Sequence, residues 1–527
     1  MKDGKKIASG YAGMTYKEYL KKYNDLVNDD MKDDYGYIVN LTKEEQELDS
    51  LMNNIREDLI GDKHVYAVRD SDDPPRIFPP MRPFYEVKDM IGADKLYGTF
   101  QRMPKGANLH IHTSSTLSAD DFWKLLMDYD NQGDGAVVVN YNKDDKVRKI
   151  YKYTVFYLKN EIPTNYKRIK ELSKEEQREL LSYLTISENS VNEEKYIWDE
   201  FDKIFQRVYH VLSIRKIYYE YYKRAFLKMI GDNTNHVELR FGPSILKESN
   251  DDELSEKAFV PDDPGKEKFE SVELIYQAYQ EAKKYAEGLK KSFSVRLIVT
   301  SSRGKKKSLE ETIAGYKNDI DWVKCYRNTI MEDGEPFIVG YDLVSEEDRG
   351  WNTHDVSQAF FDDEKLVDVP FFFHDGESCW ADNKNLFSAV TLGSVRIGHG
   401  VNLYHFPDVL EEVRHRNVTL EVCPISNQLL KYTQDLRIHP IAEYMKRGIN
   451  CVICNDDPQI FNYNGLAYDF WEIYYSQLIG LGAIKRLVFN SIQFSMLGKH
   501  KQEKLDELND EWNKFVKQEI KILSPKN

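Results

Sequence analysis

Eight short apolar segments with the composition of buried strands recur between residues 107 and 455. Segments of helical periodicity separate most of them. Nearly continuous apolar strands that alternate with helices are typical of a parallel sheet covered by helices. Eight such units over roughly 400 residues predict an α/β protein built as a (β/α)8 TIM barrel. The predicted strands are residues 107–112, 237–241, 295–300, 337–343, 370–374, 395–400, 418–423 and 451–455.

The remaining parts of the chain are predicted to be additions to a barrel that spans residues 101–500. Residues 1–100 are expected to form a helical N-terminal extension, because apolar residues recur at helical spacing behind a capping box that starts at Thr42. The connection after the first strand is too long for a simple crossover, so the charged, tyrosine-rich residues from about 118 to 200 predict an insertion. Residues 501–527 are expected to form a C-terminal helix.

The overall composition predicts a folded, acidic protein. Hydrophobic residues make up 41% of the chain and charged residues 31%, with a formal net charge of -15, so a core can be buried. The negative net charge argues against nucleic acid or an anionic membrane as a partner.

No apolar run is long enough to span a bilayer, and the first residues lack the apolar core of a signal peptide. We therefore expect a cytoplasmic protein, or a secreted one if a leader has been removed.

The five cysteines do not form a convincing disulfide framework, since their number is odd and all lie in the second half of the chain. Cys451 and Cys454 are three residues apart within an apolar run. On a strand they would face opposite sides, which argues against a zinc knuckle or a redox pair. We predict that they are buried core residues.

His110 and His112 lie two residues apart at the end of the first predicted strand. Side chains on a strand alternate in direction, so both imidazoles point to one side and suggest a metal site. In a TIM barrel the reactive groups cluster at the C-terminal ends of the strands. Further metal-capable side chains end other predicted strands, namely those of His374, His399, Asp456 and Asp457.

Three histidines and an aspartate suit one catalytic Zn2+ that keeps a position for water and lowers the pKa of that water to about 7. Glu377, three residues beyond His374, would exchange protons with the substrate, and His399 and Asp457 would orient or polarise the reactants. Each residue alone also has a structural interpretation, such as a hydrogen-bonded core histidine, a helix-capping aspartate or a surface glutamate. Their joint occurrence at four strand ends favours the catalytic interpretation.

Five motifs carry a family resemblance, in this order along the chain: Met-Pro-Lys-x-x-x-Leu-His-x-His, His-x-Gly-Glu, Arg-Ile-Gly-His-Gly, Cys-Pro-x-Ser-Asn and Asp-Asp-Pro. Over roughly residues 100–500 the chain resembles the adenosine deaminase family of the amidohydrolase superfamily. The N-terminal extension, the insertion and residues 237–240 resemble its growth-factor-like branch, in which such N-terminal helices mediate pairing, so a homodimer is expected.

The resemblance implies a zinc-dependent aminohydrolase that converts adenosine or a related nucleoside to the inosine-type product and ammonia. It implies that Glu377 protonates N1 of the purine, that His399 and Asp457 position and activate the attacking water, and that Asp457 lies near N7. The implied zinc ligands are His110, His112, His374 and Asp456.

Two departures from the family pattern leave the substrate open. The family usually has an aspartate that binds ribose shortly after the second histidine, whereas here Ser114 lies within a run of hydroxyl residues. Ser345 replaces a glycine whose backbone N–H approaches the purine. The basic loop 301–307 would either hold a phosphate or be a solvated charge run. An adenine nucleotide (AMP or ATP) deaminase is therefore the alternative, and a non-catalytic binding protein on a deaminase scaffold is the third hypothesis.

Overall fold

Eight parallel strands form the centre of the computed structural model, which describes residues 14–30, 40–61, 78–141, 144–145, 150–188, 196–254 and 263–525. One four-stranded sheet has the order β1 (Gly106–His112), β5 (Thr234–Phe241), β6 (Ser294–Ser302) and β9 (Ile338–Val344). The second has the order β12 (His374–Asp375), β13 (Arg396–His399), β14 (Thr419–Val422) and β15 (Asn450–Ile453). Each strand overlaps one of the eight predicted segments, so the predicted α/β class is confirmed.

The two sheets meet at both edges through single parallel bridges. Ile111 of β1 pairs with Asp456 beyond β15, and Tyr341 of β9 pairs with Phe371. The fifth strand is more irregular than predicted, because regular pairing begins only at His374. Pro370 has no backbone N–H to donate, and only its carbonyl accepts a hydrogen bond, from Tyr341 at 2.9 Å.

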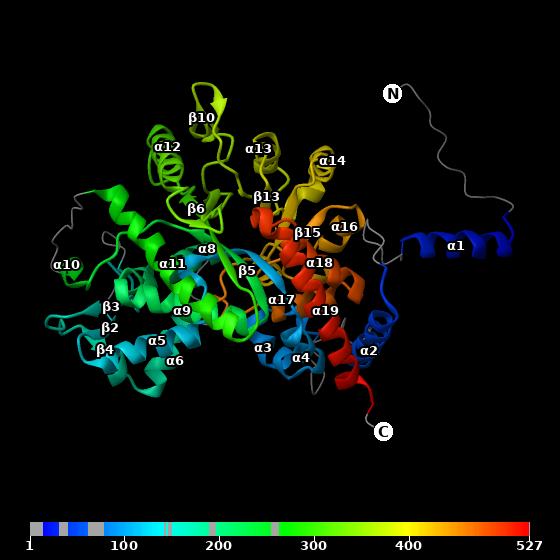
Figure 1. Cartoon of the computed structure of the whole chain (residues 1–527), viewed down its shortest axis with the longest axis horizontal. Helices are drawn as coiled ribbons and strands as arrows, with labels where there is room; N and C mark the ends of the chain where they lie inside the picture. Colours follow the sequence, from blue (N-terminus) through cyan, green and yellow to red (C-terminus); the bar gives the residue numbers. More distant parts are fainter. Residues whose placement is uncertain are drawn as a thin grey trace.

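Helices connect consecutive strands and cover the sheets (Figure 1). Their inward faces are apolar and fully buried, as in α18, where Leu487 and Val488 are inaccessible to solvent. Cys451 and Cys454 are also buried, as predicted, and no cysteine in the described residues forms a disulfide. The covering helices are α9 (Arg215–Gly231), α11 (Pro264–Gly288), α12 (Leu309–Tyr326), α13 (Asn385–Thr391), α14 (Pro407–His415), α15 (Pro424–Leu429), α16 (Ile441–Lys446), α17 (Ala467–Ser476) and α18 (Leu481–Gln493).

Short elements lie in the connecting loops. They are α10 (Asp251–Leu254), the hairpin of β7 (Met331–Glu332) and β8 (Glu335–Pro336), and the hairpin of β10 (Phe361–Asp362) and β11 (Lys365–Leu366).

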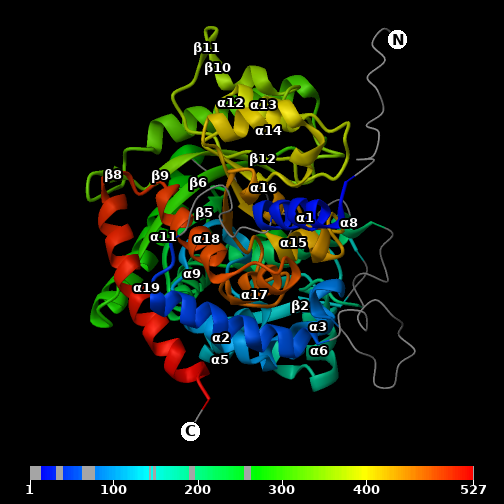
Figure 2. The ribbon, with the colours of Figure 1, turned by 90° about the vertical axis from the view of Figure 1, so that its right-hand side faces the viewer.

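The N-terminal part contains α1 (Tyr16–Asp30), α2 (Lys43–Ile60), α3 (Phe84–Ala93) and α4 (Lys95–Arg102). Thr42 and Glu45 form the predicted capping box of α2. The Glu45 carboxylate also accepts a hydrogen bond from the indole of Trp512 in α19 (Lys501–Leu523) at 2.7 Å. Helices α2 and α19 therefore pack together, as Figure 2 shows, whereas α1 extends away from the rest of the molecule (Figure 1). Among the described helices, none has the length and apolarity needed to cross a membrane.

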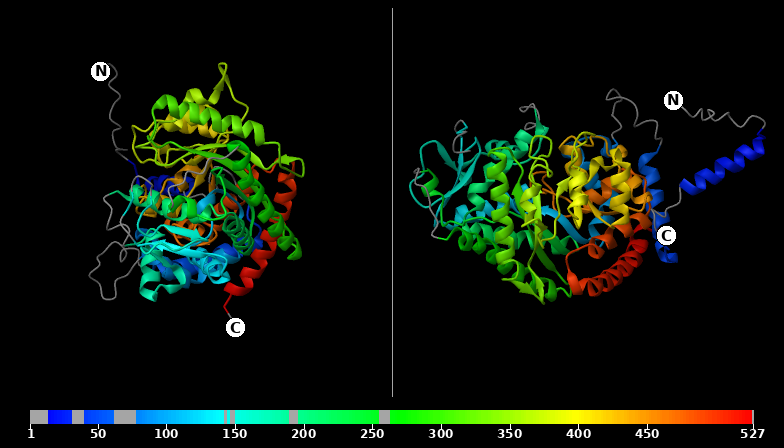
Figure 3. Two further views of the ribbon diagram at one scale, coloured as in Figure 1. Left: turned by 90° about the vertical axis from the view of Figure 1, so that its left-hand side faces the viewer. Right: turned by 90° about the horizontal axis from the view of Figure 1, so that it is seen from above.

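The segment after β1 contains a small antiparallel sheet flanked by helices. Its strands, in the order β3 (Val155–Leu158), β2 (Ala136–Asn140) and β4 (Tyr166–Arg168), lie at the end of the molecule opposite to α1 (Figure 3). The flanking helices are α5 (Ala119–Gln132), α6 (Lys174–Tyr183) and α8 (Ile197–Leu212). Asp130 fixes this sheet, because its buried carboxylate accepts the N–H groups of Val137 at 3.0 Å and Lys170 at 3.2 Å.

Candidate active site

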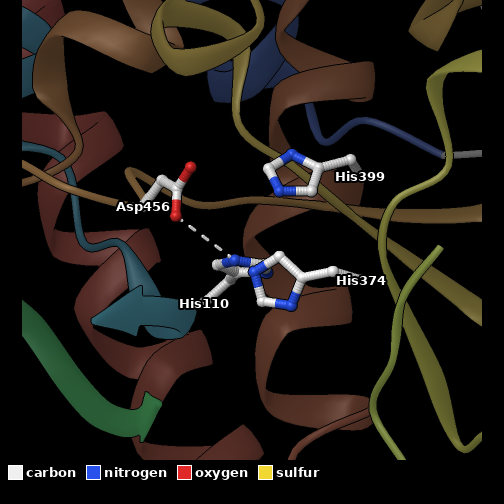
Figure 4. A group of neighbouring side chains, drawn as sticks. All are labelled: His110, His374, His399 and Asp456. Atoms are coloured by element: carbon white, nitrogen blue, oxygen red, sulfur yellow. Dashed lines mark ion pairs between the residues drawn. The ribbon is translucent and has the colours of Figure 1, made fainter. Parts of the chain in front are cut away.

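The predicted metal-capable side chains converge at the C-terminal ends of the central strands. His110 and His112 end β1, His374 begins β12, His399 ends β13, and Asp456 follows β15. The imidazoles of His110, His374 and His399 gather beside the carboxylate of Asp456 (Figure 4). His399 and Asp456 have positive φ angles of 64° and 58°. Such angles are uncommon outside glycine and typical of functional sites, where the surrounding structure enforces them.

Three separations between the ligand-type atoms of His110, His112, His374 and Asp456 are close to those expected around one zinc ion. Nε2 of His112 is 3.2 Å from Nε2 of His374 and 3.1 Å from Oδ1 of Asp456, which lies 3.3 Å from Nε2 of His110. Two atoms that each bind a tetrahedral zinc ion at about 2.1 Å are separated by about 3.4 Å. The ligand-type atoms of His110, His374, His399 and Asp456 also lie within 4.8 Å of one another, so His399 is a second candidate beside His112. Its Nδ1, however, is turned towards Nδ2 of Asn427 at 3.1 Å.

Carboxylates behind the histidines fix their orientation. Nδ1 of His110 lies 2.8 Å from Oε2 of Glu421, and Nδ1 of His374 lies 2.8 Å from Oδ2 of Asp342. Histidine ligands of metals are commonly held in this way, which leaves Nε2 for the ion. Nε2 of His110 and Oδ1 of Asp456 are buried and have no hydrogen-bond partner within the described part of the chain. The chemistry and placement of these donors therefore fit a bound divalent cation.

The pKa of Glu377 shifts in the direction expected for a proton donor, whereas those of Asp456 and His374 shift in the direction expected for metal-binding groups. Burial, together with the nearby carboxylates of Asp456 and Glu347, raises the pKa of Glu377 well above its usual value, which favours its protonated form. Burial also acts to raise the pKa of Asp456, but the adjacent imidazoles of His110 and His112 outweigh it and hold that pKa well below the ordinary value. Burial and the neighbouring histidines lower the pKa of His374, which keeps it neutral and able to bind a cation.

The remaining predicted catalytic residues surround the same point. Oε1 of Glu377 lies 3.6 Å from Nε2 of His399, and both side chains are buried. Asp457 accepts a hydrogen bond from the hydroxyl of Ser115. The backbone of Glu377 is held by Glu347, whose carboxylate accepts its N–H at 2.6 Å and that of Gly376 at 3.1 Å.

A cavity of about 980 Å³ opens onto these groups. Ser114 and Ser345, the predicted substrate-binding serines, both line it, together with Glu377 and Asp457. Ser345 has a φ of 79°, a backbone conformation that glycine adopts easily, and its hydroxyl lies 2.8 Å from that of Ser302. The replacement of glycine therefore retains the turn and adds a hydroxyl contact at the cavity wall.

Several functional residues were not identified from the sequence. Asp342 begins the Asp-Leu-x-Ser segment that ends with Ser345, and Glu421 carries no motif of its own; only the arrangement of the strands connects them with His374 and His110. The role of Ser115 was hidden in a run of hydroxyl residues. Asn427 belongs to the Cys-Pro-x-Ser-Asn motif, which pointed to this region without assigning it a contact.

The structure places a cluster of histidine and aspartate side chains that could hold a metal at the strand ends of a parallel α/β fold, beside a glutamate with a raised pKa. The protein is a metal-dependent aminohydrolase of the amidohydrolase type. The model of the adenosine deaminase family matches residues 166–512. The chain therefore belongs to the adenosine deaminase family.

Individual relatives agree with this assignment. The chain is 28% identical to adenosine deaminase 2-A of Danio rerio over 88% of its own length and 89% of that protein. Its structure resembles an adenine deaminase from Arthrobacter aurescens, with a TM-score of 0.53, 18% identity, and coverage of 78% of this chain and 99% of that one. It also resembles an amidohydrolase from Burkholderia ambifaria with bound zinc, with a TM-score of 0.50, 14% identity, and coverage of 80% and 94%.

Proposed function

We propose that this protein catalyses the zinc-dependent hydrolytic deamination of adenosine, or of a closely related adenine nucleoside, to the inosine-type product and ammonia. The observation that carries the proposal is the position of Glu377, whose raised pKa makes it a proton donor beside the histidine–aspartate cluster. Deamination at C6 of a purine needs a proton at the adjacent N1 and an activated water placed to attack C6. A buried glutamic acid and a metal centre in one cavity meet both needs.

We propose His110, His112, His374 and Asp456 as the ligands of one zinc ion. Their ligand atoms have the separations of a tetrahedral site, and neutral imidazoles with a carboxylate are a donor set that zinc accepts. When bound, zinc lowers the pKa of water to about 7 and so supplies a nucleophile at neutral pH. The bound-zinc structure from Burkholderia ambifaria supports zinc as the metal.

The proposed roles of the other residues follow from where their atoms lie. Glu377 donates its proton to N1 of the purine. His399 directs Nε2, which has no hydrogen-bond partner among the described residues, towards the attacking water. Asp457, held by Ser115, contacts the purine near N7 and the water. We further propose that Ser114 and the backbone N–H of Ser345 contact the substrate from the cavity wall.

The charges at the cavity mouth favour a nucleoside over a nucleotide. Apart from Arg240 and the carboxylates of Glu377, Asp456 and Asp457, four cationic side chains line the cavity, and four carboxylates line it too. Arg349 is already bound to Asp199 at 2.8 Å and to Glu346 at 2.6 Å. A phosphate would therefore meet little net positive charge. The cations are Lys203, Lys305, Lys306 and Arg349, and the carboxylates are those of Asp144, Asp199, Asp202 and Glu346.

Metal removal and replacement with adenosine as substrate tests the proposed function. The chelated protein should release neither inosine nor ammonia, and one equivalent of zinc per chain should restore both products in equal amounts. Restored zinc binding without any turnover of adenosine, 2′-deoxyadenosine, AMP or ATP would favour the non-catalytic hypothesis instead.

We also propose a domain organisation. The eight strands would close into one barrel over residues 101–500, since single bridges link the two sheets at both edges. The antiparallel sheet supports an insertion at about 118–200, and α19 supports a separate C-terminal helix within 501–527. Residues 1–100 would form the N-terminal extension, of which residues 1–13, 31–39 and 62–77 lie outside the described ranges.

A homodimer formed through the N-terminal helices is our proposal for the quaternary structure. One face of α1 carries apolar side chains at helical spacing, and these are exposed, with Tyr16 at 73% and Leu26 at 67%. The full set is Tyr16, Tyr19, Leu20, Tyr23, Leu26 and Val27. Sedimentation equilibrium should give a dimer for the full chain and a monomer for the Leu20→Asp/Tyr23→Asp double variant. A monomeric wild type would contradict the proposal.

A further inference from the structure

A chain of three buried side chains connects His399 with the backbone at the start of α16. Nδ1 of His399 lies 3.1 Å from Nδ2 of Asn427, and Oδ1 of Asn427 lies 3.3 Å from Nε2 of His439. Nδ1 of His439 lies 3.2 Å from the backbone nitrogen of Ile441. All three side chains are at most 4% exposed, so water does not substitute for these contacts.

The backbone N–H of Ile441 fixes the proton positions at the far end of this chain. A backbone N–H only donates, so Nδ1 of His439 must accept and therefore carries no proton. Burial lowers the pKa of His439 to about 3, so its ring is neutral at physiological pH. The single ring proton of His439 then lies on Nε2, which donates to Oδ1 of Asn427.

The same reasoning fixes the proton of His399. Because Oδ1 of Asn427 accepts from His439, the amide of Asn427 has one orientation, with its NH2 group facing His399. That NH2 group only donates, so Nδ1 of His399 accepts and carries no proton. A neutral His399 ring then carries its proton on Nε2, the atom that lies 3.6 Å from Oε1 of Glu377 and lines the active site.

We propose that Asn427 and His439 are positioning residues that hold His399 in the Nε2–H tautomer. This inference rests on the proposed function for its catalytic meaning: His399 presents an N–H to the oxygen of the attacking water. It also explains why His399 is not a metal ligand although it lies within reach of the cluster, since a protonated nitrogen has no lone pair for a cation. His112 is then left as the third imidazole ligand.

The tautomer can be observed directly by NMR of the zinc-loaded full-length protein with 15N-labelled histidine. The His399 resonances are assigned by their loss in His399→Gln. We expect a pyrrole-type shift for Nε2 and a pyridine-type shift for Nδ1. In Asn427→Asp the carboxylate accepts a hydrogen bond from Nδ1, so the two shifts should exchange. The reverse pattern in the wild type, or an unchanged pattern in Asn427→Asp, would overturn the proposal.

Kinetics and a matched control separate this role from a merely structural one. Asn427→Asp should lower kcat about 10- to 100-fold with little change in KM, whereas His439→Gln, which retains a donor towards Asn427, should stay within about threefold of wild type. Asn450→Asp makes the same substitution at another buried position, where Nδ2 contacts Asn417, and should leave both the His399 shifts and kcat unchanged. A drop in kcat for Asn450→Asp equal to that for Asn427→Asp would contradict a specific effect.

The NMR measurement does not depend on turnover. If the wild type failed to deaminate adenosine, the proposed function would be wrong, and the tautomer would still be decided by the shifts. If the wild type deaminated adenosine but His399 carried its proton on Nδ1, the proposed function would stand and the positioning role of Asn427 and His439 would be wrong.

Discussion

Nε2 of His112 lies 3.2 Å from Nε2 of His374, although the two residues are 262 positions apart in the chain. This is close to the separation that two ligands of one tetrahedral zinc ion adopt. The nearby Oδ1 of Asp456, 3.1 Å from Nε2 of His112, completes this arrangement. The contact therefore supports our proposal that His112, rather than His399, is the third imidazole ligand.

The zinc content of variants should differ between the proposed ligand His112 and the non-ligand His399. We expect His112→Ala to lose most of its zinc, because one of four ligands is removed, and His399→Gln to retain about one zinc per chain. Elemental analysis after dialysis against a weak chelator measures both. Zinc loss in His399→Gln with full retention in His112→Ala would reverse the assignment of the ligands.

Replacement of Glu377 by glutamine should separate metal binding from proton transfer. The amide has nearly the same shape but cannot donate a carboxylic proton to N1, so kcat for adenosine should fall about 10²- to 10⁴-fold. Zinc content and the unfolding temperature should remain close to those of wild type. A near-normal kcat in this variant would exclude the proposed role of Glu377.

Glu347 should matter for both stability and activity, because its carboxylate accepts hydrogen bonds from the N–H groups of Gly376 and Glu377 and from Asn385. Glu347→Gln places an NH2 group against these donors, which should cost about 1–3 kcal/mol of unfolding free energy and lower kcat.

Asp130→Asn is the matched control, since Asp130 also accepts two backbone N–H groups but lies in α5, beside the antiparallel sheet after β1. It should lose stability to a similar extent while the folded protein retains normal kcat. If Glu347→Gln lost stability but kept wild-type kcat, the link between Glu347 and the geometry of Glu377 would be refuted.

Glu472 in α17 predicts a pH-dependent stability. Burial raises its pKa from 4.5 to about 8, and neither carboxylate oxygen has a hydrogen-bond partner among the described residues. The folded state therefore holds a proton that the unfolded chain releases above pH 4.5, so stability is full below that pH and declines as the pH rises to about 8. Glu472→Gln should remove this decline, raising the unfolding free energy at pH 8 by a few kcal/mol but hardly at pH 4.5. Denaturant unfolding at both values measures the difference, and an equal effect at both would contradict it.

The strand pattern was visible in the sequence because buried parallel strands are nearly continuous apolar runs, as in Val237–Phe241 within β5. The fifth strand was harder to delimit. Pro370 has no backbone N–H to donate, and before His374 the segment pairs only through the isolated bridge between Phe371 and Tyr341. The small sheet of β2, β3 and β4 was not anticipated beyond an insertion, because short antiparallel strands between charged loops give a weak periodic signal.

For the site, the residues that bear reactive groups were predictable and their supporting contacts were not. His110, His374 and Asp456 stand at strand ends, where barrel geometry brings them together. Glu347 acts through backbone groups about 30 residues away along the chain, and no local pattern of side chains encodes such a contact.

The most direct test of the central claim is the ratio of kcat/KM for adenosine to that for AMP, measured on the zinc-loaded wild type by the loss of adenine absorbance. The charges that line the cavity are nearly balanced, and Glu377 lies beside the metal centre as a proton donor. We therefore expect turnover of adenosine, with a ratio of kcat/KM for adenosine to that for AMP above 1. A preference for AMP by more than about tenfold, equivalent to about 1.4 kcal/mol in the transition state, would contradict the assignment as an adenosine deaminase and favour a nucleotide deaminase.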